Sequence, residues 1–160
     1  MASICPQIYT NPDTQSQLRG VLQGINSGFG DISGAIGTLE AAFADTGIAS
    51  ATITLGDVVY TPSAGAVNVA DASSITTAVA IGIATGNAAS TESVTIQTGG
   101  IFENPLWTLT PGARYFLSGA TAGALVAAPD QTAAGNVAIV IGYAMSATEL
   151  NINIAPPIVY

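Results

Sequence analysis

Residues 18–43 read LRGVLQGINSGFGDISGAIGTLEAAF, and their apolar residues recur at alternating spacings of four and three. This is the heptad pattern of a coiled coil, whose apolar seam needs a partner helix to bury it. The pattern predicts an oligomerisation seam made of Leu18, Leu22, Ile25, Phe29, Ile32, Ile36, Leu39 and Phe43.

Signals at both ends set the bounds of this predicted helix. Asn11, Pro12 and Asp13 supply a capping side chain, a proline for the first turn and an acid near the positive end. Gly47 is a helix stop signal, so the predicted helical segment is 12–47. Isoleucine at alternate seam positions favours three or more strands, which predicts a homotrimer.

The glycines inside the segment are the main argument against a helix. Each of the interior glycines costs about 1 kcal/mol relative to alanine, so the helix would form only within an oligomer or a tertiary contact. The alternative is an irregular, glycine-rich segment whose periodicity arose by chance. The glycines concerned are Gly20, Gly24, Gly28, Gly30, Gly34 and Gly37.

After Ala49 the pattern changes to short β-branched runs separated by turn residues, which predicts an antiparallel β-sandwich or barrel. The predicted fold class is therefore α+β. We divide the chain into an arm at 1–11, the helical segment at 12–47, a β domain at 48–154 and a tail at 155–160. The arm and tail are candidate contacts with neighbouring proteins through Ile4, Ile8, Tyr9, Ile158, Val159 and Tyr160.

A weak internal repeat lies within the predicted β domain. Residues 80–84 read AIGIA and residues 140–144 read VIGYA, and each run is followed by Thr-Glu and another strand. We expect two similar hairpins, with Glu92 and Glu149 at equivalent positions. A glycine in the middle of a strand indicates a bulge or a close backbone approach.

Composition excludes several functions. Charged residues make up 8% of the chain, the formal net charge is -8, and the only basic residues are Arg19 and Arg114. Phosphate binding needs clustered Lys and Arg, so we expect neither a nucleic-acid partner nor an anionic membrane partner. No secretory or membrane-spanning pattern is visible, and Cys5 is the only cysteine. We predict no metal and no cofactor.

The side chains offer little catalytic chemistry. His is absent and no Lys occurs, so a nucleophile has no ordinary base. Carboxylates could act in pairs, but solvated strand ends are the simpler interpretation, and we predict that the protein is not an enzyme. The carboxylates considered are Glu92, Glu149, Asp57, Asp71 and Glu103.

Aromatic residues and one arginine form a further group. Trp107 with Phe102, Tyr115 and Phe116 predicts core packing, with a sugar-binding platform as the alternative. For Arg114 we expect an ion pair with Glu103 or Asp130, or stacking on Trp107.

The strings LTPGARYFLS at 109–118, TAGAL at 121–125, AGNV at 134–137, IGYA at 141–144 and ATEL at 147–150 form one motif. This motif resembles a β module that recurs in virion proteins of tailed bacteriophages: head fibres, capsid decoration proteins and some tail fibres. The resemblance covers the last third of the chain, and residues 50–154 more loosely.

The resemblance implies a homotrimer on the surface of a virus particle. Because the chain is short and lacks shaft repeats, it favours a capsid decoration, or cement, protein that binds the major capsid protein and stabilises the phage head. The alternative is a head-fibre or tail-fibre component that binds the host surface.

Overall fold

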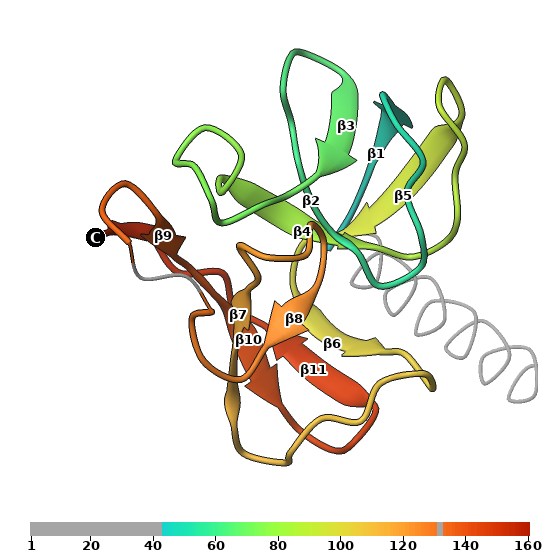
Figure 1. Cartoon of the computed structure of the whole chain (residues 1–160). Helices are drawn as coiled ribbons and strands as arrows, with labels where there is room; N and C mark the ends of the chain where they lie inside the picture. Colours follow the sequence, from blue (N-terminus) through green and yellow to red (C-terminus); the bar gives the residue numbers. More distant parts are fainter. Residues whose placement is uncertain (1–42, 131–132) are drawn as a thin grey trace, which may run out of the picture. The chain divides into compact units, whose positions relative to one another are not determined.

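The computed structural model describes residues 43–130 and 133–160 of the chain (Figure 1). These residues form β-strands and loops, and no helix occurs among them. In chain order the strands are β1 (Ala44–Ala49), β2 (Val58–Tyr60), β3 (Ala66–Val69), β4 (Ala80–Ala84), β5 (Ser93–Gln97), β6 (Gly100–Glu103), β7 (Arg114–Leu117), β8 (Leu125–Val126), β9 (Val137–Ala138), β10 (Val140–Ala144), β11 (Glu149–Ile152) and β12 (Ile158–Val159).

Strands β1 to β5 form a closed barrel in the order β1-β3-β2-β4-β5. β1 closes the ring, because it pairs with β5 in antiparallel orientation and with β3 in parallel. The N–H of Ile48 donates to the C=O of Gly65 at 2.9 Å, and the N–H of Ser50 donates to the C=O of Val67 at 2.8 Å. The barrel is therefore mixed, and its one parallel pair is the pair that closes it.

Gly47 makes this closure possible. A Cβ atom built at Gly47 would lie 2.2 Å from Cγ2 of Val67, well inside the contact distance of two carbon atoms. Only a residue without a side chain lets β1 lie so close to β3. Gly47 is thus a strand residue chosen for close packing, not the stop signal of a helix.

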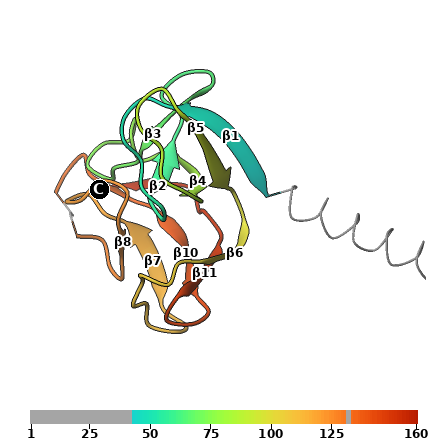
Figure 2. The same cartoon turned by 90° about the vertical axis from the view of Figure 1, so that its right-hand side faces the viewer.

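Five of the remaining strands form an open antiparallel sheet in the order β6-β11-β10-β7-β8. β9 runs directly into β10 and pairs with the C-terminal strand β12 in a separate two-stranded sheet. In the view of Figure 2 the barrel lies above and the open sheet below.

The barrel and the open sheet are two copies of one five-stranded arrangement. Strands β6, β7, β8, β10 and β11 pair in the same order as β1, β2, β3, β4 and β5. The loops agree as well: the N–H of Gly56 donates to the C=O of Ala84, and the N–H of Gly112 donates to the C=O of Ala144, at 2.9 and 2.8 Å. The structure therefore extends the repeat predicted from two short strands to the whole β region.

The central strand of each copy carries a glycine pressed against its neighbour. A Cβ atom at Gly82 would lie 2.4 Å from the carbonyl oxygen of Gln97, and one at Gly142 would lie 2.1 Å from that of Asn151. The pairing of each central strand with β2 or β7 also shifts register once. The expected close approach and irregularity are both present.

The register corrects one detail of the predicted repeat. Ala84 lies opposite Ile96, and Ala144 lies opposite Leu150, so Ile96 and Leu150 are equivalent. Two residues before Ile96 is Val94, and Glu92 lies a further two positions away. The equivalence of Glu92 and Glu149 is therefore wrong, because the first copy has a longer turn before its strand.

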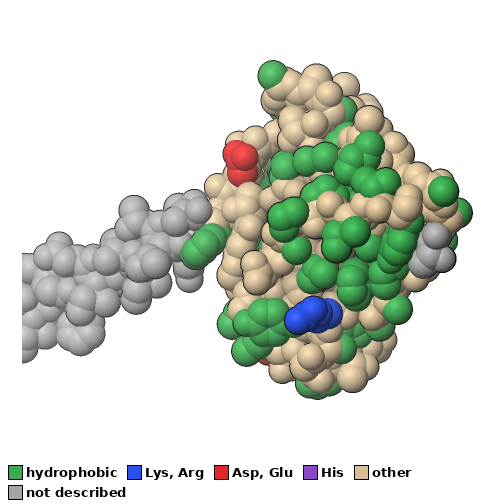
Figure 3. Space-filling model, turned by 90° about the vertical axis from the view of Figure 1, so that its left-hand side faces the viewer, with side chains coloured by type: hydrophobic (Ala, Val, Ile, Leu, Met, Phe, Trp, Pro, Cys, Tyr) green, Lys and Arg blue, Asp and Glu red, His purple; other side chains and the backbone are tan. Residues whose placement is uncertain are grey.

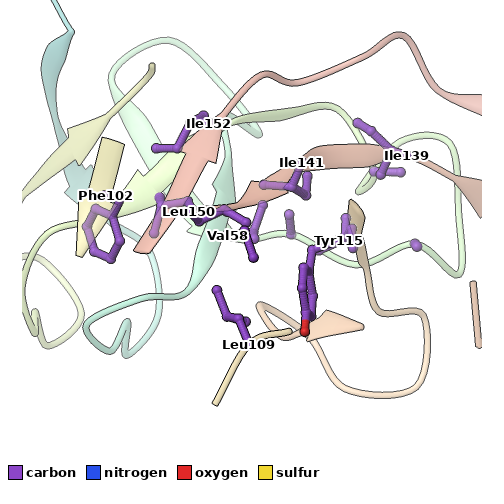
Figure 4. Close-up of a cluster of buried hydrophobic side chains, with 14 of the residues drawn as sticks. Val58, Phe102, Leu109, Tyr115, Ile139, Ile141, Leu150 and Ile152 are labelled. Carbon is purple, nitrogen blue, oxygen red and sulfur yellow. The ribbon is translucent and has the colours of Figure 1, made fainter. Parts of the chain in front are cut away.

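The buried side chains form two clusters, of which the second holds the copies together. The first fills the barrel and contains Val59, and the second lies between the barrel and the open sheet and contains the neighbouring Val58. Successive side chains of a strand point to opposite faces, so β2 serves both cores. Figure 4 shows Val58 within the second cluster, near Leu150 and Ile141 of the open sheet.

The predicted α+β class is wrong for the described residues, which are all-β. The predicted helix would continue to Thr46, but residues Ala44–Ala49 are strand β1 and bond to strands on both sides. The coiled coil is therefore not supported. Its predicted residues from 12 to 42 lie outside the described residues, as does the arm 1–11.

Candidate functional site

The two copies differ most at the place where the barrel closes. Phe102 lies opposite Leu150 on the open sheet, as Asp45 lies opposite Ile96 in the barrel. Phe102 and Asp45 are therefore equivalent. Counting onward from them, Asn104 stands where the barrel has Gly47, and Pro105 follows it.

Pro105 takes the place of Ile48, whose N–H makes the closing bond in the barrel. Proline has no N–H, so this bond cannot form in the second copy. Asn104 also replaces the glycine that β1 needs for its close approach. As a result β6 ends at Glu103 and does not pair with β8.

A pocket of about 350 Å³ occupies this open seam. One wall is Gly123–Leu125, the counterpart of the segment that β1 pairs with in the barrel. The lining residues come from both copies: Leu55, Gly56, Asp57, Leu106, Trp107, Thr108, Leu109, Tyr115, Gly123, Ala124 and Leu125.

Local hydrogen bonds fix the loop that carries Trp107. The side-chain oxygen of Asn104 accepts the N–H of Leu106 at 3.0 Å, and the main-chain oxygen of Asn104 accepts the N–H of Trp107 at 3.1 Å. The N–H of Leu109 donates to Ala147 at 2.8 Å. The indole ring also packs against Phe102 at a centroid distance of 5.3 Å and an angle of 46°.

A loop of the barrel lies close to Asn104 and to the indole ring of Trp107, at Gly56. Gly56 has φ +91°, and a Cβ atom there would lie 2.5 Å from Nδ2 of Asn104 and 3.4 Å from Nε1 of Trp107. A side chain at Gly56 would therefore displace the Asn104 side chain and would come into van der Waals contact with Trp107. The barrel loop and the open-sheet loop fit together only because this position is glycine.

Three polar groups line the pocket with free hydrogen-bonding capacity. One carboxylate oxygen of Asp57, Oδ2, accepts the N–H and the hydroxyl of Thr54, each at 2.8 Å, while Oδ1 has no donor among the described residues. The indole N–H of Trp107 likewise has no acceptor within the described part of the chain. The hydroxyl oxygen of Tyr115 accepts the N–H of Thr110 at 2.9 Å, which leaves its own hydrogen to donate.

A second feature is the solvent-facing side of the open sheet. Arg114, Tyr143, Asn151 and Ile101 lie in one row across β7, β10, β11 and β6. A shallow groove of about 290 Å³ runs beside this row and is lined by Arg114, Val140, Gly142, Tyr143, Asn153 and Ala155. Figure 3 shows apolar side chains over much of this face, around a single basic side chain.

Arg114 does not behave as the sequence predicted. Its side chain has no ion-pair partner among residues 43–130 and 133–160, and it is not stacked on Trp107. Glu103 lies on β6 opposite Glu149, and Asp130 accepts hydrogen bonds from Ser118 and Gly119 instead. Arg114 is thus available to an external partner.

The C-terminal strand β12 is the third feature. Ile158 is 66% exposed and Val159 is 54% exposed, although both lie in a strand bonded to β9. The N–H and C=O of Tyr160 also bond to Asn136 and Gly135 at 3.0 and 3.1 Å. The tail is therefore held in place while its apolar side chains face solvent.

Asp130 organises the end of the β7–β8 pair. Burial raises the pKa of its carboxyl, but hydrogen bonds from the Ser118 hydroxyl and from the N–H groups of Gly119 and Ala120 outweigh this effect. The net result is a pKa below the ordinary value. This carboxylate has a structural role. The sequence gives little sign of it, because the hydrogen-bond donors lie ten to twelve residues before Asp130 and no local motif links them to it.

The core packing predicted for the aromatic residues is present for three of the four. Phe102, Trp107 and Tyr115 meet around the second core and the pocket. Phe116 does not join them, because it follows Tyr115 on β7 and so faces the other side of the sheet.

Among the predicted oligomerisation and arm residues, the structure describes Phe43. Phe43 lies next to Gly99, and its C=O accepts the N–H of Thr98 at 2.7 Å, as an extension of the barrel edge. The others lie outside the described residues: Leu18, Leu22, Ile25, Phe29, Ile32, Ile36, Leu39, Ile4, Ile8 and Tyr9.

The candidate carboxylates are not gathered into one site. Glu92 accepts the N–H of Ala89 in a turn, whereas Glu149 lies on β11 opposite Glu103. The described residues contain no group of three or more Asp, Glu, Cys or His side chains placed to hold a metal ion.

Comparison with known proteins does not identify the chain: no family model matches it, and no curated protein matches it. Within the described residues, no helix is long and apolar enough to span a membrane.

Proposed function

We propose that the protein is a structural component of a bacteriophage virion, a decoration or cement protein located on the capsid surface. Its proposed partners are further copies of itself, as a homotrimer, and the major capsid protein. The proposal joins the resemblance of residues 109–150 to virion β modules with the surface of the β region.

The observation that carries the proposal is the exposure of β12. Ile158, Val159 and Tyr160 form an ordered, apolar strand end that residues 43–130 and 133–160 leave open to solvent. Apolar side chains gathered in this way are typical of a surface that contacts another protein. β12 also has a free edge within the described residues, and a partner strand could pair with it.

Charge supports a protein partner of this kind. The strand and the neighbouring groove carry one charged side chain, Arg114, which has no ion-pair partner in the described part of the chain. Arginine and aromatic residues are enriched at protein interfaces, and charged residues are depleted at their centres. A decoration protein that binds the assembled shell, but not the free capsid subunits, would stabilise that shell by mass action.

A second candidate is a head-fibre or tail-fibre component that binds the host surface. The pocket beside Trp107 favours it, because a pocket that combines an aromatic wall with converging polar groups is typical of small-ligand sites. The groove and β12 support the role as a decoration protein, and the pocket supports the role as a fibre component.

The test is co-sedimentation of the purified full-length chain with emptied phage capsids, together with its mass in solution. We expect a trimer that sediments with capsids. Ile158→Glu should abolish capsid binding, because it places a charge in the proposed contact.

Ile48→Glu is the matched control. Ile48 is 50% exposed, but it lies on the barrel strand β1. This variant should sediment like the unaltered protein. Equal binding of both variants, or no binding of the unaltered chain, would exclude β12 as the attachment site.

A further inference from the structure

The pocket at the open seam is a built feature of the fold. It exists because Pro105 and Asn104 prevent the second copy from closing, and its volume of about 350 Å³ lies within the range of ligand pockets. It shares no lining residue with the contacts proposed for β12.

The walls are fixed before any ligand binds. Trp107 is held by its own main-chain bond to Asn104, by the ring of Phe102 and by the close approach of Gly56. On the other side, the N–H of Val58 donates to Gly123 and the N–H of Gly123 donates to Ala70, at 2.9 and 2.8 Å. A preformed pocket loses little entropy on binding.

The polar groups define the chemistry of the ligand. No buried side-chain nitrogen or oxygen among the described residues lacks a hydrogen-bond partner. The indole N–H of Trp107 and Oδ1 of Asp57 have no hydrogen-bond partner among the described residues. These two atoms are therefore not buried and are in contact with solvent. Together with the Tyr115 hydroxyl, they offer donors and an acceptor within one small pocket.

The apolar side chains of the pocket further restrict the class of ligand that fits it. Leu55, Leu106, Leu109 and Leu125 surround the polar groups, and Leu106 is 83% exposed at the rim. An apolar wall with an indole suits the C–H face of a sugar ring, while hydroxyls of that ring can donate to Asp57 and accept from Trp107. The carboxylate of Asp57 disfavours an anionic ligand.

We propose that this pocket binds one neutral sugar unit of a glycan, with Trp107 as its platform and Asp57 as its hydroxyl acceptor. This goes beyond the structural role proposed above and does not depend on it. A capsid-bound protein with this pocket would present a sugar-binding site at the virion surface.

The chain contains a single tryptophan, so its fluorescence reports on the pocket directly. The full-length protein is titrated with glucose, galactose, mannose and N-acetylglucosamine, and binding is checked by saturation-transfer NMR. We expect a saturable response to at least one of these sugars. Ethanolamine serves as the cationic probe and acetate as the anionic probe.

Three variants test the assignment by NMR. Asp57→Asn keeps the size of the side chain and should weaken binding by about tenfold, because a hydroxyl loses its charged acceptor. Trp107→Phe should do the same by removing the N–H and part of the platform. Leu106→Ala changes an exposed side chain, so it tests the rim without a cost to folding.

Tyr143→Phe is the control, since Tyr143 is an aromatic residue on the other face of the open sheet. It should bind sugar as the unaltered protein does. A protein that responds to none of the sugars, or responds only to ethanolamine, would overturn the proposal, and so would sugar binding unaffected by all three pocket variants. Capsid sedimentation of Trp107→Phe is measured in parallel and should be unchanged.

Discussion

The barrel and the open sheet pair their strands in the same order, yet only one of them closes. The difference comes down to two adjacent positions. Gly47 and Ile48 let β1 lie against β3 and donate to it, whereas Asn104 and Pro105 at the equivalent place can do neither. The comparison teaches that one residue pair converts a closing strand into the wall of a pocket.

The largest effect is expected at the glycine that both copies share. Gly142→Ala would place a Cβ atom 2.1 Å from a main-chain oxygen of β11, which can move only if the strands separate. We expect a loss of about 3 kcal/mol or more in the free energy of unfolding, measured by urea denaturation. Gly82→Ala should cost a similar amount.

Gly86→Ala is the control for these variants. No atom lies within 4 Å of a Cβ built there, and Gly86 does not have a positive φ. The change should stay within about 0.5 kcal/mol. If Gly142→Ala and Gly86→Ala were equally stable, the close approach of the central strands would not be real.

A smaller effect is expected where the barrel closes. Gly47→Ala would place its methyl group against the side chain of Val67, which can move more easily than main chain. We expect a loss of about 2 kcal/mol. Urea denaturation measures it, and Gly47→Ala/Val67→Ala should recover part of the loss by removing the methyl groups that collide. If the free energy of unfolding lost by the double variant exceeded the sum of the losses of the two single variants, this would argue against direct contact.

At the equivalent position of the open copy, Asn104→Ala removes the acceptor for the N–H of Leu106. Asn104 is buried, so the loss should be about 1 kcal/mol. The fluorescence of Trp107 should also shift to longer wavelength, because its loop is held less firmly. An unchanged emission maximum would show that the Asn104 side chain does not position this loop.

The smallest effect concerns Asp130, which holds the β7–β8 end of the open sheet. Its pKa is lowered in the folded protein, so its contribution to stability is complete above the ordinary carboxyl value of about 3.9 and is lost as the pH falls through the folded value. Asp130→Asn should therefore be less stable than the unaltered protein at pH 7, and the gap should shrink at low pH. A gap independent of pH would contradict the assignment.

The sequence predicted much of the β region because its strands carry β-branched residues between turn signals. β4 and β10 coincide with the two runs of the predicted repeat, residues 80–84 and 140–144. β1 was missed because residues 44–49 read ADTGIA, which has few strand-forming residues and follows an apolar heptad pattern. β6 has a weak strand signal because Gly99 and Gly100 are typical turn residues; Gly100 has φ +76° but begins the strand.

The candidate site was only partly predictable. Trp107, Phe102 and Tyr115 were grouped by sequence proximity, and they do meet. Asp57 lies fifty residues before Trp107, on the other copy, and its place beside Gly123 depends on how the two copies pack. Aligning Gly47 and Ile48 with Asn104 and Pro105 would have marked the seam, but this alignment needs the strand register.

The most direct test of the two-copy account is hydrogen exchange of single amides by NMR on the full-length chain. The N–H groups of Ile48 and Ser50 donate to the C=O groups of Gly65 and Val67 across the closing pair. The account predicts that these two amides exchange as slowly as those in the barrel interior, and that Gly47→Ala accelerates both. Rapid exchange of Ile48 and Ser50 in the unaltered protein would mean that the barrel is not closed, and the contrast between the copies would fail.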